Sequence, residues 1–167
     1  IDISNIETGQ IETYFTPVNI NSHLDELYSF FKHEAWEKGL EFLQEKELPD
    51  EEAVIQTDNE KLYAILSNLL KNAIKYTEKG TVVFGYQPEG QYIKFYVQDS
   101  GMGIPEERQK AVFERFVQAD LHYAKAREGS GLGLSITKAY VEMLGGQIGL
   151  KSEEGSGSLF YFYIPRQ

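Results

Sequence analysis

The chain has 167 residues, of which 41% are hydrophobic, and its 16 basic and 26 acidic residues give a net charge of −10. A chain of this length can bury a substantial core as one domain, whereas its acidic balance argues against binding along a nucleic-acid backbone. It contains no cysteine, which excludes disulfides and thiolate metal sites, and no apolar run approaches the 18 residues of a membrane-spanning helix.

In chain order, the first half of the sequence predicts a linker, a helix, two strands and a second helix. Residues 1–15 read as the end of a helix followed by an extended entry. Helical spacing of apolar residues then covers residues 21–38, and two short strands are predicted within residues 40–58. The strongest helix is predicted over residues 59–77, where apolar side chains form one broad stripe and Asp58 is available as the N-cap.

The second half predicts a hairpin, a short helix, a long polar segment, a third main helix and a second hairpin. These elements span residues 81–99, 105–113, 114–131, 134–144 and 147–164. The first hairpin is expected to turn at Pro88-Glu89-Gly90. The order is not a regular alternation of strand and helix, so it favours a two-layer α/β domain with a mixed sheet and helices on one face.

Two asparagines on the strongest predicted helix are candidates for a polar site. The run "NLLKNAIKYT" places Asn68 and Asn72 four residues apart, on one helix face, with Lys75 three residues further on. Asparagines near a core boundary usually hydrogen-bond to local backbone. Two asparagines on one helix face beside a lysine instead favour a site that faces phosphate. Magnesium takes oxygen ligands from few side chains together with substrate phosphates, and an asparagine can supply one neutral oxygen.

Two further motifs follow, and each also has an ordinary structural explanation. In "QDSGMGIP", Asp99 ends an apolar strand and could accept a hydrogen bond from an exocyclic amine, although an Asp-Ser-Gly turn is a common loop solution. In "FERFVQAD", the two phenylalanines could anchor the polar segment after them, or could simply pack in the core. A long segment without periodicity is often a lid, and Arg115, Lys125 and Arg127 would bring cations to it.

The stretch "EGSGLGLSITKAY" places Gly129, Gly131 and Gly133 before a predicted helix. The free N–H groups at a helix start can bind an anion. The pattern is neither a Walker loop nor a dinucleotide-binding fingerprint, because no GxxxxGK[ST] occurs and position 134 is leucine. Taken alone, the glycines are therefore weak evidence.

In order, "NLLKNAIKYT", "DSGMGI", "FERF", "GSGLGL" and "GSGSLF" resemble the N, G1, F, G2 and G3 boxes of sensor histidine kinases. The resemblance covers residues 16–165 and is specific, because five motifs must occur in one order. It implies the Bergerat ATP-binding fold of the GHKL superfamily. That fold is a two-layer α/β sandwich with a mixed five-stranded sheet, three main helices on one face and a flexible ATP lid, for which greatest mobility is expected at residues 118–130.

The resemblance implies roles around the base and the metal, with ATP and Mg²⁺ as cofactors. Asn72 resembles the magnesium ligand, Tyr76 an aromatic residue that packs on adenine, and Asp99 the residue that reads the adenine amine. The other implied contacts on this side are Gly101, Gly103, Ile104 and Ser158.

The resemblance also implies roles on the phosphate side. Asn68, Lys75 and Arg115 resemble catalytic positions, and Lys125 would be a lid cation. The implied lid hinge and phosphate-binding end are Gly129, Gly131, Leu132 and Gly133.

Two positions depart from patterns in the superfamily. Members that hydrolyse ATP carry a glutamate where this chain has Asn68, and an amide cannot take a proton from water. Transfer to an acceptor is therefore favoured over hydrolysis. Several kinases also have a second arginine three residues after the F-box arginine, where this chain has Gln118.

The phosphoacceptor histidine is expected to lie outside this chain. His33 is followed by glutamate but lacks the rest of an H-E-x-[RN]-x-P context, and an ordinary surface position is expected for it. Residues 1–15 then read as the remnant of a dimerisation and phosphoacceptor helix, and residues 16–167 as the catalytic domain. A stand-alone ATPase and a degenerate interaction module remain alternatives.

The resemblance implies partners and a location for the longer protein. The expected partners are its own dimerisation domain and a response-regulator receiver domain, with no nucleic acid and no direct membrane contact from this domain. The parent protein is expected to be a homodimer and an inner-membrane sensor of a bacterium, with this domain in the cytoplasm. The isolated domain is expected to bind ATP but not to phosphorylate itself.

Overall fold

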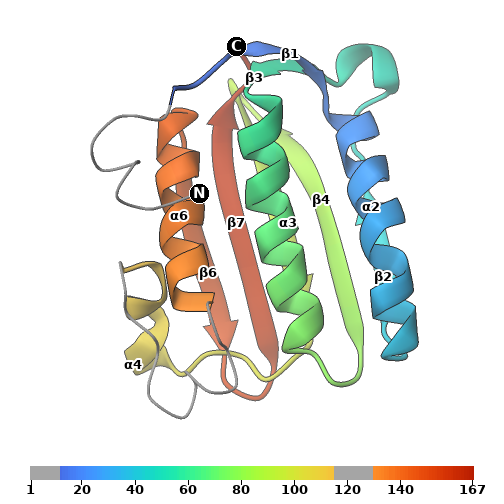
Figure 1. The fold of residues 1–167 in the computed structure, drawn as a ribbon, viewed down its shortest axis with the longest axis vertical. Coiled ribbons are helices and arrows are strands. Elements are labelled where there is room, and N and C mark those ends of the chain that lie inside the picture. Colours follow the sequence, from blue (N-terminus) through green and yellow to red (C-terminus); the bar gives the residue numbers. More distant parts are fainter. Residues whose placement is uncertain (1–11, 115–129) are drawn as a thin grey trace.

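A five-stranded mixed sheet and three helices on one of its faces form two layers (Figure 1). The computed structural model describes residues 12–114 and 130–167. The strand order is β2-β4-β5-β7-β6, in which β2 is parallel to β4 and the other neighbours are antiparallel. The predicted two-layer α/β architecture with a mixed five-stranded sheet is confirmed.

The elements divide into the main layers and smaller additions. The covering helices are α2 (Ile20–Glu37), α3 (Asn59–Lys75) and α6 (Ser130–Met143). The strands of the sheet are β2 (Glu41–Glu45), β4 (Thr81–Glu89), β5 (Tyr92–Asp99), β6 (Gln147–Glu153) and β7 (Gly157–Pro165). Additional short elements are β1 (Thr16–Asn19) and β3 (Val54–Thr57), which pair with each other, the helix α4 (Glu106–Gln109) and two 3-10 turns at Asp50–Glu52 and Ala111–Phe113.

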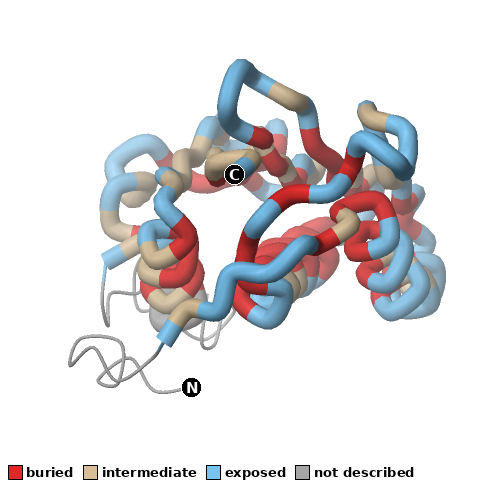
Figure 2. The backbone as a smooth tube through the Cα atoms, turned by 90° about the horizontal axis from the view of Figure 1, so that it is seen from above, coloured by how far each residue is buried: buried red, intermediate tan, exposed pale blue. Residues whose placement is uncertain are grey.

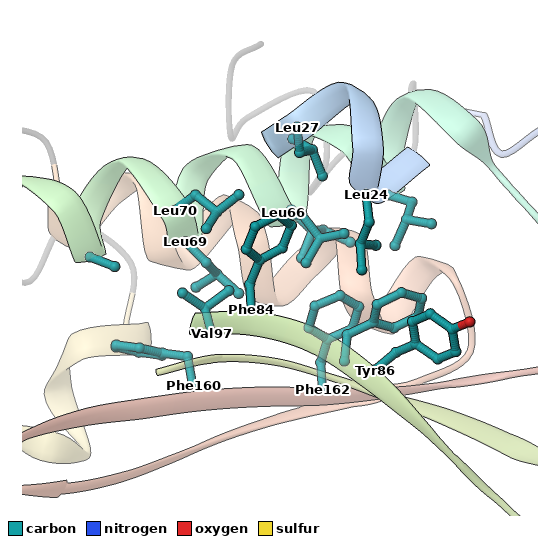
Figure 3. Packing of buried hydrophobic residues seen from close by; sticks show 14 of the residues in the cluster. Leu24, Leu27, Leu66, Leu69, Leu70, Phe84, Tyr86, Val97, Phe160 and Phe162 are labelled. Atoms are coloured by element: carbon teal, nitrogen blue, oxygen red, sulfur yellow. The ribbon is translucent and has the colours of Figure 1, made fainter. Parts of the chain in front are cut away.

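The core lies between the sheet and the helices. Figure 3 shows leucines of α2 and α3, among them Leu24 and Leu66, packed against Phe84, Phe160 and Phe162 of the strands. Period-two alternation directs one face of each strand inward, and seen from above the buried residues lie along the inner sides of the two layers (Figure 2). Burial of this apolar surface is the main driving force that holds the helices on the sheet.

Helix α3 packs over the middle of the sheet and runs from one end of the molecule to the other (Figure 1). It begins as predicted at an aspartate cap, because the Asp58 side chain accepts a hydrogen bond from the backbone N–H of Lys61 at 3.0 Å. Its start lies near β1 and β3, and its end lies at the opposite end of the molecule (Figure 1). The helix stops at Lys75, so Tyr76 and Thr77 lead out of it.

Two predicted boundaries are wrong. Helix α6 begins at Ser130 rather than after Gly133, because tertiary context overrides the low helix propensity of glycine. The first hairpin turns after Glu89, and Pro88 lies within β4 opposite Ile93. Proline is tolerated there because β2 pairs only with Thr81–Gly85, which leaves the end of β4 with an open edge.

None of the helices within residues 12–114 and 130–167 combines the length and the hydrophobicity that crossing a bilayer requires.

Candidate functional site

A hollow at the C-terminal end of α3 brings together residues from four parts of the chain. The segments are the last turn of α3, the loop after β5, the start of α6 and the start of β7. The residues that line the hollow are Asn72, Ala73, Tyr76, Asp99, Met102, Gly103, Ile104, Leu134, Ser158 and Phe160. Six of these are predicted nucleotide-binding residues, so the fold gathers motifs that lie up to 86 positions apart in the sequence, the separation of Asn72 from Ser158.

Asp99 is placed by the sheet itself. It is the last residue of β5, and its neighbours across the strands are Val82 of β4 and Ser158 of β7. One carboxylate oxygen, Oδ1, accepts a hydrogen bond from the backbone N–H of Gly101 at 2.9 Å. The Asp-Ser-Gly turn that the sequence suggested is therefore present, and the same half-buried carboxylate also lines the hollow.

Gly101 and Gly103 let the loop after β5 pack tightly against the protein. A Cβ on Gly101 would lie 2.4 Å from the backbone oxygen of Tyr76. Gly103 has a φ of +69°, and a Cβ there would lie 2.2 Å from the backbone oxygen of Glu153. Larger residues would push the loop away from α3 and β6, so both glycines are required by the shape of the hollow.

A hydrogen-bonded group that sequence reasoning missed fixes this loop. The Ser152 hydroxyl accepts from the backbone N–H of Ile104 at 2.8 Å and lies 2.9 Å from the Ser158 hydroxyl. The Gln109 amide donates to the backbone oxygens of Ile104 and Ser152 at 2.8 and 2.9 Å. No motif marks Ser152 or Gln109, because only the register of β6 on β7 places Ser152 opposite Ser158.

The floor of the hollow is apolar and closed. Ile104, Leu134 and Phe160 are each at most 7% exposed, and the free space between the lining residues is about 20 Å³. That space suits a water molecule rather than a purine. A flat base therefore requires side chains to move, and the lining residue Met102 is 43% exposed.

The polar residues of α3 separate into two places. Asn72 lines the hollow, whereas Asn68 lies in a neighbouring groove between α3 and α6 and donates to the Thr137 hydroxyl at 2.8 Å. Lys75 is exposed, with its ammonium 5.4 Å from the centre of the Tyr76 ring. Sequence reasoning missed Thr137 as the partner of Asn68, because the contact depends on how α6 packs on α3.

The groove is lined by polar residues of α3 on one side and by α6 on the other. Lys71 and Ser67 lie there beside Asn68. On the α6 side, burial raises the pKa of Tyr140, and the nearby carboxylates of Asp58 and Glu60 act in the same direction. The Tyr140 hydroxyl therefore stays protonated at neutral pH.

The remaining predicted positions lie elsewhere. Arg115, Lys125 and Gly129, together with Gln118 and most of the predicted lid, lie outside the described residues. Gly131, Leu132 and Gly133 fall within helix α6. His33 is exposed on α2, as expected for an ordinary surface histidine, with its ring 5.8 Å from that of Trp36.

The fold and the hollow define a class of nucleotide-binding domain, and comparison with known proteins agrees. Residues 57–167 match the family described as histidine kinase-, DNA gyrase B-, and HSP90-like ATPase. The circadian input-output histidine kinase CikA of Synechococcus elongatus is 35% identical over 168 residues, which cover 100% of this chain and 22% of that protein. The chain belongs to this ATPase family, and within it to the ATP-binding domains of sensor histidine kinases.

Solved structures of histidine kinases also resemble the chain in fold. Full-length ShkA in complex with AMPPNP superposes with a TM-score of 0.80 at 32% identity, covering 93% of this chain and 32% of that one. The histidine kinase ThkA in complex with the response regulator protein TrrA gives a TM-score of 0.78 at 25% identity, covering 99% of this chain and 46% of that one. The chain spans about a fifth of the length of CikA, so it corresponds to one part of a larger relative.

Proposed function

We propose that this domain binds MgATP in the hollow at the end of α3 and presents the γ-phosphate to a histidine on a separate dimerisation domain. The observation that carries the proposal is the convergence of Asn72, Tyr76, Asp99 and Ser158 from three separated segments into one hollow. In this proposal Asp99 accepts a hydrogen bond from the exocyclic amine of adenine. Tyr76 and Ile104 pack on the base.

The donor set at the hollow fits magnesium that arrives with the nucleotide. Among the residues that the structure describes, no three His, Asp or Glu side chains cluster as a metal site. Asn72 offers one neutral oxygen, and magnesium commonly takes its other ligands from phosphates and water. The ion would supply charge stabilisation at the phosphates, while Asn72 orients the triphosphate relative to the base site.

Phosphoryl transfer is supported over ATP hydrolysis by the surroundings of Asn68. A general base for water must accept a proton, and an amide at this position cannot do so at neutral pH. Its amide group also donates to Thr137, which holds the side chain in the groove beside the hollow. Positioning and charge stabilisation account for most catalysis of phosphoryl transfer, so Lys75 and Arg115 are assigned to the phosphate side.

The proposal extends to partners outside the chain. We infer a homodimeric parent with its own phosphoacceptor domain, and a response-regulator receiver domain as the next acceptor, which the ThkA–TrrA complex supports by analogy. We also infer that the parent is an inner-membrane sensor of a bacterium, with this domain on the cytoplasmic side.

Calorimetry with MgATP tests the binding half of the proposal. The wild-type domain should bind, and Asp99→Asn should lose roughly 10- to 100-fold in affinity, because an amide presents an N–H where the adenine amine needs an acceptor. Asp25→Asn is the matched control, since Asp25 lies on the exposed face of α2 and forms an ion pair with Lys46 there. Equal affinities for the wild type and Asp99→Asn would refute the assigned base site.

Labelled ATP tests the transfer half. The isolated domain should acquire no label, and it should release little phosphate. Label on His33 would refute the inference that the acceptor lies outside this chain, and rapid phosphate release would favour a stand-alone ATPase. If the wild type binds no MgATP at all, a degenerate interaction module becomes the better explanation.

A further inference from the structure

Met102 differs from the other residues that line the hollow in its exposure to solvent. It is 43% exposed, whereas Ile104, Leu134 and Phe160 in the floor are at most 7% exposed. The other lining residues, all of which the structure describes, are buried or half-buried, so Met102 is the only exposed one. A reagent dissolved in water can therefore reach this side chain more readily than the rest of the lining.

The backbone of Met102 is fixed, so its side chain is the part that can adapt. Its carbonyl oxygen accepts a hydrogen bond from the backbone N–H of Gly155 at 2.7 Å. On either side of it, a Cβ on Gly101 or Gly103 would lie only 2.4 or 2.2 Å from a backbone oxygen. The free space of about 20 Å³ cannot hold a purine, so side chains have to move when a base enters. The unbranched and exposed methionine is the lining residue best able to move.

The two sulfur atoms of the chain differ in their surroundings. The sequence contains two methionines and no cysteine. The second methionine, Met143, lies on α6, where it is half-buried and packs against the core. Met143 is not among the residues that line the hollow. Because the oxidation of sulfur follows its exposure, Met102 should react before Met143.

A hydroperoxide such as hydrogen peroxide converts the thioether of methionine into a sulfoxide. A lone pair of the sulfur attacks one peroxide oxygen, the O–O bond breaks, and the second oxygen leaves as water with both protons. The sulfur is oxidised by two electrons and the peroxide is reduced by two. The product is polar where the thioether was apolar, which disrupts apolar contacts of the side chain.

We propose that Met102 is an oxidation site and that its sulfoxide weakens the binding of nucleotide in the hollow. A base that enters the hollow would remove the sulfoxide oxygen from water. The side chains of Ile104, Leu134 and Phe160 carry no hydrogen-bond donor for that oxygen, so its burial is costly. Methionine sulfoxide reductases regenerate the thioether, which makes the effect reversible. This inference rests on the proposed ATP binding and adds a regulation of that site.

Calorimetry with MgATP before and after treatment with hydrogen peroxide tests the inference, while mass spectrometry of peptides measures the sulfoxide at each methionine. In the wild type, Met102 should be oxidised faster than Met143. The affinity for MgATP should fall about 5- to 10-fold once Met102 is oxidised. Treatment with the two reductases that act on the two sulfoxide epimers should restore it.

Two leucine variants separate Met102 from other groups that peroxide attacks, because leucine has a similar volume and no sulfur. Met102→Leu should bind MgATP equally well before and after peroxide, whatever its untreated affinity is. Met143→Leu is the matched control, which should bind like the wild type when untreated and lose affinity like the wild type after peroxide. Met102→Gln places a polar amide at this position, and it should bind more weakly than Met102→Leu without any peroxide.

The inference is overturned if the wild type with oxidised Met102 keeps its untreated affinity, or if Met102→Leu loses as much affinity on treatment as the wild type does. Faster oxidation of Met143 than of Met102 would also overturn it. Failure of the untreated wild type to bind MgATP would instead overturn the proposed function, and this inference with it.

Discussion

The two ends of helix α3 use their polar residues in opposite ways (Figure 1). At the N-terminal end, the Lys61 ammonium contacts Asp58 at 3.2 Å and the backbone oxygen of Glu12 at 2.6 Å, and both side chains of the pair are at most 9% exposed. At the C-terminal end, Asn72 is half-buried and Lys75 is exposed, while Thr77 is buried without a partner in the described residues.

The difference separates a structural end from the end at which we propose that nucleotide binds, called the ligand-binding end below. Burial alone would raise the pKa of Asp58, but hydrogen bonds from the backbone N–H groups of Tyr14 and Lys61 and from the Lys61 ammonium outweigh it and lower the pKa. Asp58 therefore stays ionised and joins residues 12–14 to the start of α3. At the other end, the Asn72 side chain lines the hollow, where a nucleotide can use it.

The largest expected effect comes from Lys61→Met at the structural end. It leaves the Asp58 carboxylate buried without its cation, which should lower the free energy of unfolding by about 3–5 kcal/mol. The affinity for MgATP, measured where the variant is still folded, should stay unchanged. Urea denaturation and calorimetry measure the two quantities.

Lys46→Met serves as the control, because its ion pair with Asp25 is largely exposed and should contribute at most about 1 kcal/mol. A Lys61→Met variant as stable as this control would show that the N-terminal end is not a structural anchor.

Gly103→Ala should give the next largest effect, now at the ligand-binding end. The positive φ and the 2.2 Å approach to Glu153 should cost about 1–3 kcal/mol of stability, and displacement of the loop should also reduce ATP affinity about 10-fold or more. Gly90→Ala is matched in backbone conformation, with a φ of +61° and nothing within 4 Å of its Cβ. Gly90→Ala should lose stability but keep its affinity for ATP. If Gly103→Ala binds ATP normally, the loop does not shape the site.

The smallest expected effect is a pH dependence at the structural end. Burial lowers the pKa of His23 below its ordinary value of 6.5, against the opposing hydrogen bond with Asn59 and the nearby Glu26 carboxylate. The unfolded chain then binds a proton more readily than the folded one. Stability from this residue is present above pH 6.5 and is lost as the pH falls through the range between 6.5 and the lowered folded pKa.

His23→Gln should flatten the decline in stability between about pH 7 and pH 5, as followed by denaturation at each pH. His33→Gln, on the exposed side of the same helix, should leave the wild-type profile unchanged. If the stability of His23→Gln declines as steeply as that of the wild type, other titrating groups cause the decline.

Much of the proposed ligand-binding end could be predicted from the sequence, because its motifs contain the side chains that line the hollow. Asn72, Tyr76, Asp99 and Ser158 do meet at one hollow. Residues that act only through a neighbour could not be predicted. Ser152 depends on the strand register, and the contact of Asn68 with Thr137 depends on how α6 packs on α3.

The fold shows the same division. Apolar periodicity predicted the main helices and strands, whereas the pairing of β1 with β3 and the anchoring of residues 12–14 on α3 depend on contacts between distant segments. The periodicity of neighbouring residues does not predict contacts between distant segments. The predicted boundary between residues 15 and 16 stays a prediction.

The central claim is that only the C-terminal end of α3 binds nucleotide, and titration of the labelled domain with MgATP followed by amide NMR shifts tests it most directly. The account predicts that shifts concentrate at residues 72–77, 99–104 and 158, with residues 58–61 and 12–14 unmoved. Shifts that concentrate at the N-terminal end of α3, or no shifts at saturating MgATP, would contradict it.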